Sequence, residues 1–523
     1  MYDVILKNGL IMDGRGGKPY KADVAVFSSS IALITNSNIS RGKKVVDCTG
    51  KIVAPGFIDS HTHSDFLFFS DPKASYRVGQ GITTDISGNC GIGVFPYKNP
   101  ILKEFVKDVL GEWKDWNWND FSSYKAYIQK NGMGCNEAFL VSHTALRSYV
   151  MGNDSLREAT EREVEDMCAL LSSELDKGAI GFSSGLYYSP CVFASPFEIL
   201  SLLKVVASKN KIFSVHHRSE GRGCVKSLEE VLEYAKESGV RLEVSHLKAI
   251  GKENEKNIDV MLGMIEKYRE EGVDVKFDVY PYTFGSTSLF SLLPPRVLAY
   301  SRLEQRMALS LDSERRTIKE EIMDPDGWDS VYPMVGPDAI KALYLSSHPE
   351  YNGMTLSEIA GIKDLSDPLD ALFDILEDET GLAVMTDVTE SEENFEKVIS
   401  HSLSCFGTDS LYSSPLPHPR SFHSTVEFLK KYVMERKLMT MEEGIRRMTG
   451  ETADRFGLRD RGTLEEGKAA DITVFDPKLL SLVDERRNRG FSLVLVNGKV
   501  AVENDGITGE LGGKVLTIYR QVA

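Results

Sequence analysis

The strongest local signal in this 523-residue chain is residues 56–63, Gly-Phe-Ile-Asp-Ser-His-Thr-His, where an apolar run ends in His61 and His63. On an extended strand, side chains two residues apart point to the same side, so both imidazoles can reach one metal ion. A pair of solvated polar residues would give the same local pattern. The motif therefore indicates a metal site only if other ligand-type side chains also follow apolar strands.

Outward from this motif, short apolar runs alternate with longer amphipathic stretches, which include residues 161–177, 227–238 and 257–271. The apolar runs predict eight strands, at residues 52–58, 83–86, 137–141, 179–182, 213–215, 242–244, 275–279 and 404–406. Alternating strands and helices are typical of parallel βα units, and eight of them favour an α/β fold with a (β/α)8 TIM-like barrel. Catalytic side chains of such barrels gather at the carboxyl ends of the strands.

Both ends of the chain have a different pattern of apolar runs and turns. Residues 4–6 and 10–12 are apolar runs followed by Asn8-Gly9 and Asp13-Gly14, pairs that predict hairpin turns. Strand-like runs return near the other end, at residues 471–475, 494–496 and 515–518. These two β-rich ends predict one small β-sandwich built from both termini.

The gap between the last two predicted barrel strands is too long for one helix. It carries Pro294-Pro295 and a charged stretch at residues 302–319, so we expect an insertion that forms a lid or small subdomain. The predicted division has five parts: 1–53, the N-terminal part of the sandwich; 54–290, the first part of the barrel; 291–400, the insertion; 401–460, the last part of the barrel; and 461–523, the C-terminal part of the sandwich.

The composition of the chain argues against some kinds of binding partner and favours one location in the cell. Lys and Arg number 61 against 77 Asp and Glu, a net charge of −16 without a basic cluster, which argues against a nucleic-acid partner. Seven cysteines without a repeating spacing are typical of reduced thiols in the cytoplasm. Asp3 and Lys7 interrupt any apolar signal core, and no stretch is long enough to span a membrane.

Three further ligand-type residues follow predicted strands: Cys90, His216 and His246. A thiolate with two imidazoles is a zinc-type ligand set. Cys90 alone would most simply be a small buried apolar residue, but its flanking glycines indicate a turn at which the backbone approaches another group closely. His217 competes with His216, since only one of two adjacent side chains can face the site, and the spacing does not choose between them.

Asp409 follows the last predicted strand. A carboxylate beside a metal site can accept a proton from water and return it to a leaving amine. An N-cap role would also explain this residue. Because several such residues each close a strand, together they favour a catalytic metal site.

These residues resemble the amidohydrolase superfamily. Residues 53–63 are similar to its first-strand signature, and residues 462–471 are similar to the point where its members return to the terminal sandwich. Within the superfamily, other motifs resemble those of the N-acyl-D-amino-acid deacylases (D-aminoacylases): Gly88-Asn89-Cys90-Gly91, His216-x-Arg218-Ser219-Glu220, Ser245-His246-Leu247-Lys248, Tyr280-Pro281-Tyr282, Gly285-Ser286 and His418-Pro419-Arg420. The resemblance covers nearly the whole chain.

The resemblance implies zinc-dependent hydrolysis of the linear amide of small-molecule N-acyl-D-amino acids. It implies one tight zinc site at Cys90, His216 and His246, and so selects His216 over His217. It also implies a weaker second metal position at His61 and His63, with Asp409 as the general acid and base. The residues that it implies for binding the substrate's carboxylate and amide are Lys248, Tyr280, Ser286 and Arg420.

Two alternatives remain beside this interpretation. Cyclic-amide hydrolases, of the hydantoinase and dihydroorotase type, often use a carboxylated lysine from the fourth strand, but residues 178–184 contain no lysine and Lys177 precedes the strand. A non-catalytic scaffold of the same fold would be expected to lack metal ligands, which this chain retains. The chain departs from the resemblance at Asp409-Ser410, where the family often has Asp-Gly, and along residues 411–417.

Overall fold

A parallel eight-stranded barrel forms the centre of the molecule, as predicted. The computed structural model describes residues 1–39 and 41–519. The barrel strands follow one another in sequence around the sheet: β6 (Phe57–Asp59), β7 (Ile82–Ser87), β8 (Asn136–Ser142), β9 (Gly181–Gly185), β10 (Ile212–His216), β11 (Arg241–Val244), β12 (Val275–Val279) and β16 (Ser404–Phe406). The barrel closes beyond β6 and β16, where the Asp409 amide donates to the His61 carbonyl at 2.7 Å.

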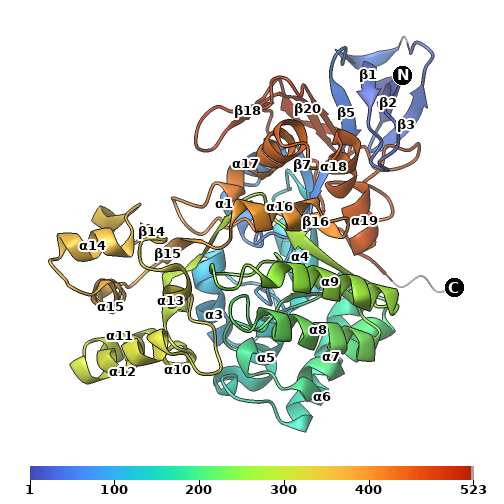
Figure 1. Cartoon of the computed structure of the whole chain (residues 1–523). Helices are drawn as coiled ribbons and strands as arrows, with labels where there is room; N and C mark the ends of the chain where they lie inside the picture. Colours follow the sequence, from blue (N-terminus) through green and yellow to red (C-terminus); the bar gives the residue numbers. More distant parts are fainter. Residues whose placement is uncertain (40, 520–523) are drawn as a thin grey trace.

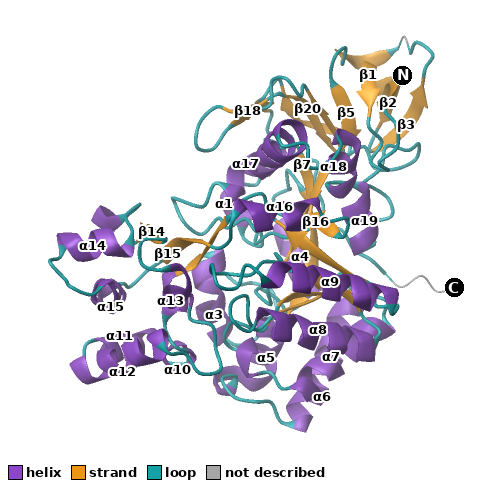
Figure 2. Ribbon diagram, viewed as in Figure 1, coloured by secondary structure: helices purple, strands orange, loops and turns teal. Residues whose placement is uncertain are grey.

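Helices cover the outside of the barrel (Figures 1 and 2). Thr160 caps α6 and forms a capping box with Glu163, which explains why this amphipathic stretch begins there. The apolar faces of the helices join the barrel strands in one large core. The helices around the barrel are α3 (Ile101–Leu110), α4 (Phe121–Gln129), α5 (His143–Met151), α6 (Glu161–Asp176), α7 (Pro196–Ser208), α8 (Cys224–Ser238), α9 (Asn257–Glu270), α16 (Glu392–Ser400), α17 (Arg420–Glu427), α18 (Met441–Arg447) and α19 (Gly450–Phe456).

Both ends of the chain join in one further sheet, at the upper right of Figure 1. Its strands lie in the order β22-β21-β20-β17-β5-β1-β2-β3, with β4 also paired to β1. Its strands are β1 (Tyr2–Ile11), β2 (Tyr20–Phe27), β3 (Ser30–Thr35), β4 (Gly42–Asp47), β5 (Ile52–Pro55), β17 (Ile472–Phe475), β20 (Phe491–Val496), β21 (Lys499–Glu503) and β22 (Gly506–Ile507). The sheet is therefore built from both termini, with β5 hydrogen-bonded between β1 and β17.

Three expectations for the ends of strands were wrong. Asn8-Gly9 is not a turn, because β1 continues through it with a bulge and Asn8 has φ 60°. Residues 52–58 are not one strand, since the chain changes sheets at Gly56, where a Cβ would lie 2.1 Å from Thr83 Oγ1. Residues 515–518 form no strand of the terminal sheet, and Val515 instead bridges Glu137 of barrel strand β8.

The insertion has its own sheet and its own apolar core. Strand β13 (Phe284–Ser288) pairs antiparallel with β15 (Ala383–Val388), which also pairs with β14 (Ile340–Leu345). The helices of this part, which extends to the left in Figure 1, are α10 (Pro295–Leu298), α11 (Arg302–Leu309), α12 (Asp312–Met323), α13 (Val331–Val335), α14 (Leu356–Ile362) and α15 (Pro368–Asp378). Because β13 begins directly after the turn that follows β12, the insertion stands at the carboxyl ends of the barrel strands.

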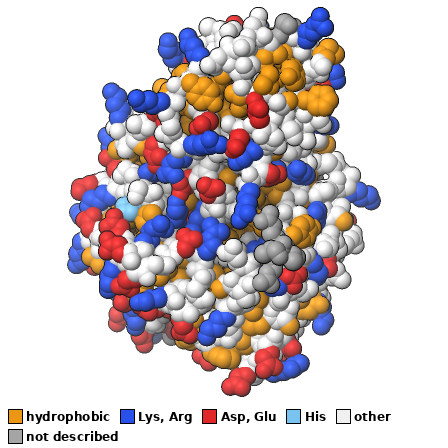
Figure 3. All heavy atoms as spheres, turned by 90° about the vertical axis from the view of Figure 1, so that its right-hand side faces the viewer, with side chains coloured by type: hydrophobic (Ala, Val, Ile, Leu, Met, Phe, Trp, Pro, Cys, Tyr) orange, Lys and Arg blue, Asp and Glu red, His pale blue; other side chains and the backbone are white. Residues whose placement is uncertain are grey.

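The surface carries both signs of charge. On the face drawn in Figure 3, Lys and Arg side chains are interspersed with Asp and Glu. Among the described residues, no helix is both long and apolar enough to cross a membrane.

Candidate active site

Six ligand-type side chains meet at the carboxyl ends of the barrel strands. His61 and His63 follow β6, Cys90 follows β7, and His216 is the last residue of β10. The Cys90 Sγ lies 3.3 Å from His61 Nε2 and 3.5 Å from His246 Nε2. His216 Nδ1 lies 3.1 Å from His246 Nε2.

Asp409, the sixth side chain, completes the cluster after β16. Its Oδ1 lies 3.2 Å from His63 Nε2 and 3.5 Å from His61 Nε2. All six residues are at least nine-tenths buried. The structure therefore brings together every metal ligand that the sequence predicts, together with the predicted acid and base.

The donor atoms of this cluster fit a transition-metal ion. Three groups have ligand atoms that all lie within 4.8 Å of one another: His61, Cys90 and His246; His61, His63 and Asp409; and His216, Glu220 and His246. A thiolate, imidazoles and carboxylates, turned toward one another in a buried space, are the ligands that zinc prefers. The shared members His61 and His246 mean that the groups overlap and could hold more than one ion.

The protonation of Cys90 agrees with a ligand role. Burial by itself raises the pKa of the thiol, but His61 and His246 outweigh burial and hold that pKa well below its usual value. This environment favours the thiolate, which is the form that binds metals.

Three of the six residues have a strained backbone. Cys90 has φ 52°, His246 has φ 34° and Asp409 has φ 49°, in the left-handed region that L residues rarely adopt. Each such residue costs of order 1–3 kcal/mol and persists only where the surroundings hold it. The glycine beside Cys90 serves the same turn, because a Cβ on Gly91 would lie 2.5 Å from the Gly185 amide nitrogen. Three of the twelve non-glycine residues with positive φ in the described part of the chain therefore belong to the cluster.

Two carboxylates that orient the ligands were missed by the sequence interpretation. Asp278 Oδ2 lies 3.0 Å from His61 Nδ1, and its Oδ1 accepts the His246 amide at 2.9 Å. Glu220 Oε1 lies 2.9 Å from His246 Nδ1. Such partners fix the ring orientation of metal-binding histidines. One feature of the sequence could have identified Asp278, since it is an acidic residue near the end of an apolar strand, two residues before Tyr280.

Arg77 forms a buried ion cluster behind the ligands and was also missed. Its guanidinium pairs with Asp59 and lies 2.6 Å from Asp85 Oδ1. Asp59 accepts the amides of His61 at 3.1 Å and Thr408 at 2.9 Å. Arg77 therefore supports the two segments, after β6 and after β16, that carry the metal-type ligands and the carboxylate.

His217, the competitor of His216, lies outside the cluster. Its Nδ1 is 2.6 Å from Ser227 Oγ on α8. Burial lowers the pKa of His217 to about 3, so the ring is neutral at pH 7. The alternation of strand side chains thus directs His216, and not His217, toward the other ligands.

The four residues predicted to bind substrate also line one cavity beside the ligands. The Tyr280 ring lies between two cations, 5.4 Å from Lys248 Nζ and 4.8 Å from the Arg420 guanidinium carbon. Arg420 donates to the Ser286 carbonyl at 3.1 Å and pairs with Asp409 Oδ2 at 3.0 Å. Ser286 Oγ is buried without a hydrogen-bond partner among the described residues. These groups can bind an anionic carboxylate next to the ligand cluster.

The charge of Asp409 is stabilised by its neighbours. Burial raises the pKa of this carboxyl, but Arg420 and His63 outweigh burial and hold the pKa well below its ordinary value. Asp409 is therefore ionised at neutral pH and able to accept a proton.

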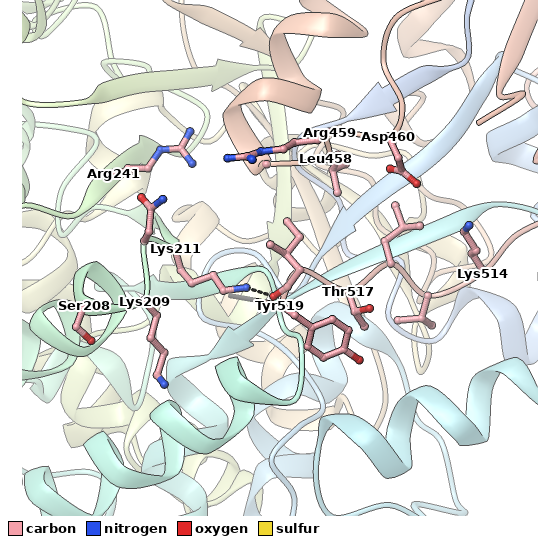
Figure 4. Close-up of a pocket in the computed structure, with 15 residues that line it drawn as sticks. Ser208, Lys209, Lys211, Arg241, Leu458, Arg459, Asp460, Lys514, Thr517 and Tyr519 are labelled. Carbon is pink, nitrogen blue, oxygen red and sulfur yellow. Dashed lines mark hydrogen bonds between the residues drawn. The ribbon is translucent and has the colours of Figure 1, made fainter. Parts of the chain in front are cut away.

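A larger cavity, about 670 Å³, lies at the opposite end of the barrel, before β10 and β11 (Figure 4). Two of its cations have structural partners: Lys211 donates to the Ile518 carbonyl, and Arg241 lies 3.0 Å from Asp274. None of the clusters of potential metal ligands among the described residues lies there. This cavity is separate from the ligand cluster.

Known proteins match the chain over nearly its full length. The sequence model of the amidohydrolase family matches residues 44–292 and 356–502. A D-aminoacylase of Alcaligenes xylosoxydans xylosoxydans is 30% identical over 98% of this chain and 97% of its own length. An N-acyl-D-glutamate deacylase of the same organism is 30% identical over 91% of this chain and 87% of its own length.

A solved structure also resembles this chain over its full length. It is N-acyl-D-glutamate deacylase of Bordetella bronchiseptica in complex with zinc and a phosphonate that mimics the tetrahedral intermediate. The two chains are 30% identical with a TM-score of 0.84, covering 99% of this chain and 100% of the other.

Proposed function

This chain belongs to the D-aminoacylases of the amidohydrolase family, and we propose that it hydrolyses the linear amide of N-acyl-D-amino acids. The products are a carboxylate and a free D-amino acid. The observation that carries the proposal is the buried cluster of Cys90, four strand-end histidines and Asp409 beside a carboxylate-binding group.

We propose that zinc is the metal of this cluster. Cys90, His216 and His246 would hold one tight ion, and His61 and His63 would contribute to a weaker second position. When bound, zinc supplies a Lewis acid that lowers the pKa of water and polarises an amide carbonyl. The thiolate and imidazole donors support zinc, and His246 is common to the group that contains Cys90 and to the group that contains His216.

Asp409 is the proposed general acid and base. Its ionised carboxylate can take the proton of the attacking water and later deliver it to the leaving amine nitrogen. Arg420 and His63 orient the two oxygens of Asp409 from opposite sides. Because the same carboxylate serves both steps, the proton travels only a short distance.

The substrate's α-carboxylate is the proposed ligand of Arg420, Lys248, Tyr280 and Ser286. A guanidinium can donate two parallel hydrogen bonds to a carboxylate, and the unpartnered Ser286 hydroxyl adds another donor. Once the carboxylate and the scissile amide are both held, the side chain can leave the stereocentre in only one direction. This constraint, with the names of the relatives, supports the D configuration.

A cyclic-amide substrate is less well supported. Barrel strand β9 has no lysine, and Lys177 at the end of α6 lies 2.6 Å from Glu174 and 2.9 Å from Asp120. Lys177 thus pairs with carboxylates before β9 begins, away from the ligand cluster. A cytoplasmic location also remains part of the proposal, since the seven cysteines are all free.

The test is a comparison of enantiomers with zinc-loaded protein. N-acetyl-D-amino acids should be hydrolysed, while their L forms and the carboxamides of the D forms should not. A ninhydrin or coupled assay for the released amine measures this directly. Equal cleavage of D and L forms, or of acids and carboxamides, would contradict the proposed binding of the carboxylate, and cleavage of dihydropyrimidines alone would favour a cyclic substrate.

A further inference from the structure

The cavity beside the ligand cluster contains more carboxylates than cations. Its lining includes two cations, Lys248 and Arg420, and both are already paired. Lys248 Nζ lies 3.0 Å from Glu220 Oε1, and Arg420 lies 3.0 Å from Asp409 Oδ2. Two other carboxylates line the same cavity, Asp329 and Asp387, both contributed by the insertion.

Asp387 is the more deeply placed of these two acids. It is the fifth residue of β15, directly opposite Gly285 of β13, and only 5% of it is exposed. Within the described part of the chain, its carboxylate forms no ion pair and accepts no hydrogen bond from another side chain. A Cβ placed on Gly285 would lie 3.3 Å from Asp387 Oδ1, so the carboxylate stands close to the proposed carboxylate-binding residues. A buried carboxylate without a cation is costly unless a ligand supplies the cation.

Asp329 stands farther out. It lines both this cavity of about 70 Å³ and an adjoining outer cavity of about 860 Å³. One oxygen accepts the Gly221 amide at 2.8 Å, and among residues 1–39 and 41–519 it has no cationic partner. The two acids therefore mark a path from the ligand cluster toward the outer cavity.

We propose that Asp387 and Asp329 bind the side chain of the substrate, and that the substrates are N-acyl derivatives of D-amino acids with long basic side chains, such as D-arginine and D-lysine. This inference rests on the deacylase function proposed above. It separates this chain from the relative named for D-glutamate, because an acidic side chain here would meet two uncompensated carboxylates. Met334 and Met385, which line the same cavity, suit the methylene groups of a long basic side chain.

The test compares four substrates of zinc-loaded protein: N-acetyl-D-arginine, N-acetyl-D-lysine, N-acetyl-D-norleucine and N-acetyl-D-glutamate. Norleucine has a similar length without the charge. The two basic substrates should exceed norleucine in kcat/KM by roughly tenfold or more, with glutamate the poorest, since charge pairing in a desolvated site dominates such ratios. If N-acetyl-D-norleucine or N-acetyl-D-glutamate has the highest kcat/KM of the four, the inference is refuted while the deacylase function stands. If none of the four is hydrolysed, the deacylase function fails and the inference fails with it.

Variants assign the preference to particular residues. Asp387→Asn should lower kcat/KM for the basic substrates roughly thirtyfold, because their charged side chains lose an anionic partner. The kcat/KM for N-acetyl-D-norleucine, which has no charged side chain, should change by less than about threefold. Asp329→Asn should act in the same direction but less strongly. Asp338→Asn, an exposed acid of the same insertion, is the matched control and should leave all four values unchanged. An equal loss for all substrates in Asp387→Asn would refute the proposed role, since it would make Asp387 a structural residue.

A binding measurement gives a second, independent readout. The Asp409→Asn protein, which should turn over substrate about a hundredfold more slowly or less, can be titrated with N-acetyl-D-arginine and N-acetyl-D-norleucine by calorimetry. Arginine should bind roughly tenfold more tightly, and adding Asp387→Asn should remove that difference. Equal affinities in the Asp409→Asn protein would overturn the proposal.

Discussion

Replacing Arg77 with methionine should destabilise the barrel without removing any metal ligand. Arg77 is fully buried and pairs with Asp59 and Asp85, and it also lies 3.1 Å from Ser410 Oγ. Methionine fills much of the same volume but leaves two carboxylates buried without their cation. Breaking a buried pair in this way costs about 3–5 kcal/mol.

The cost should depend on pH, with a definite sign. Burial already raises the pKa of Asp85 to about 6, although Arg77 opposes it, so loss of Arg77 raises the pKa further. When the pKa of a carboxyl is higher in the folded state than in the unfolded state, where it is about 3.9, the folded protein loses stability as the pH rises from the lower pKa to the higher one. Arg77→Met should therefore be closer to wild type at pH 5 than at pH 8.

The assay is scanning calorimetry of the zinc-loaded protein at both pH values. At roughly 1 °C per kcal/mol for a chain of this size, the barrel transition of Arg77→Met should fall by about 3–5 °C at pH 8. The control is Arg162→Met on α6, where an arginine with 77% side-chain exposure pairs with Glu165 and Asp166 at 3.3 and 3.2 Å. That change should stay within about 0.5 kcal/mol. A transition of Arg77→Met within 2 °C of wild type at pH 8 would refute the reasoning.

The other predictions concern metal, chemistry, binding and alkaline stability. Cys90→Ala should lose most of the roughly one tight zinc per chain, measured by metal analysis, and full retention would remove Cys90 from the site. Asp409→Asn should keep its zinc and its fold while kcat falls about a hundredfold or more; near-normal turnover would exclude it as acid and base. Arg420→Met should raise KM for the acids by roughly tenfold or more and matter little for any slow carboxamide hydrolysis, and an equal effect on both would argue against carboxylate binding. Burial and Lys209 lower the pKa of Lys211 to about 8, so wild type should gain stability relative to Lys211→Met as pH rises from 8 toward 10.5, and parallel curves would contradict this shift.

The barrel could be predicted because its strands are short apolar runs, each of which is buried on both sides. The prediction at residues 275–279 matches β12, and the prediction at residues 404–406 matches β16. The ligand cluster could be predicted because each ligand follows such a strand. The resemblance to the D-aminoacylases, carried by these motifs, is confirmed by the relatives.

What could not be predicted depends on partners far away in the chain. At Gly56, where the chain passes from one sheet to the other, Thr83 leaves no room for a side chain. Asp278 and Glu220 orient histidines from other strands, and Arg77 contacts residues more than 300 positions away. A local sequence pattern does not predict contacts between residues that are far apart in the chain. The four predicted boundaries between domains stay predictions, as do the roles of the site residues, which the variants above can test.

The place of β5 in the terminal sheet has a consequence for the growing chain on the ribosome. Strand β5 needs β1 on one side and β17 on the other, and β17 is made more than 400 residues later. At 5–20 residues per second the ribosome needs roughly 20–80 seconds for that interval. During this time a wholly buried strand of the finished protein has an unpaired, apolar edge. The N-terminal strands are therefore a natural binding site for a chaperone during synthesis, and a nascent chain halted before residue 472 should remain prone to aggregate even where its barrel strands are already complete.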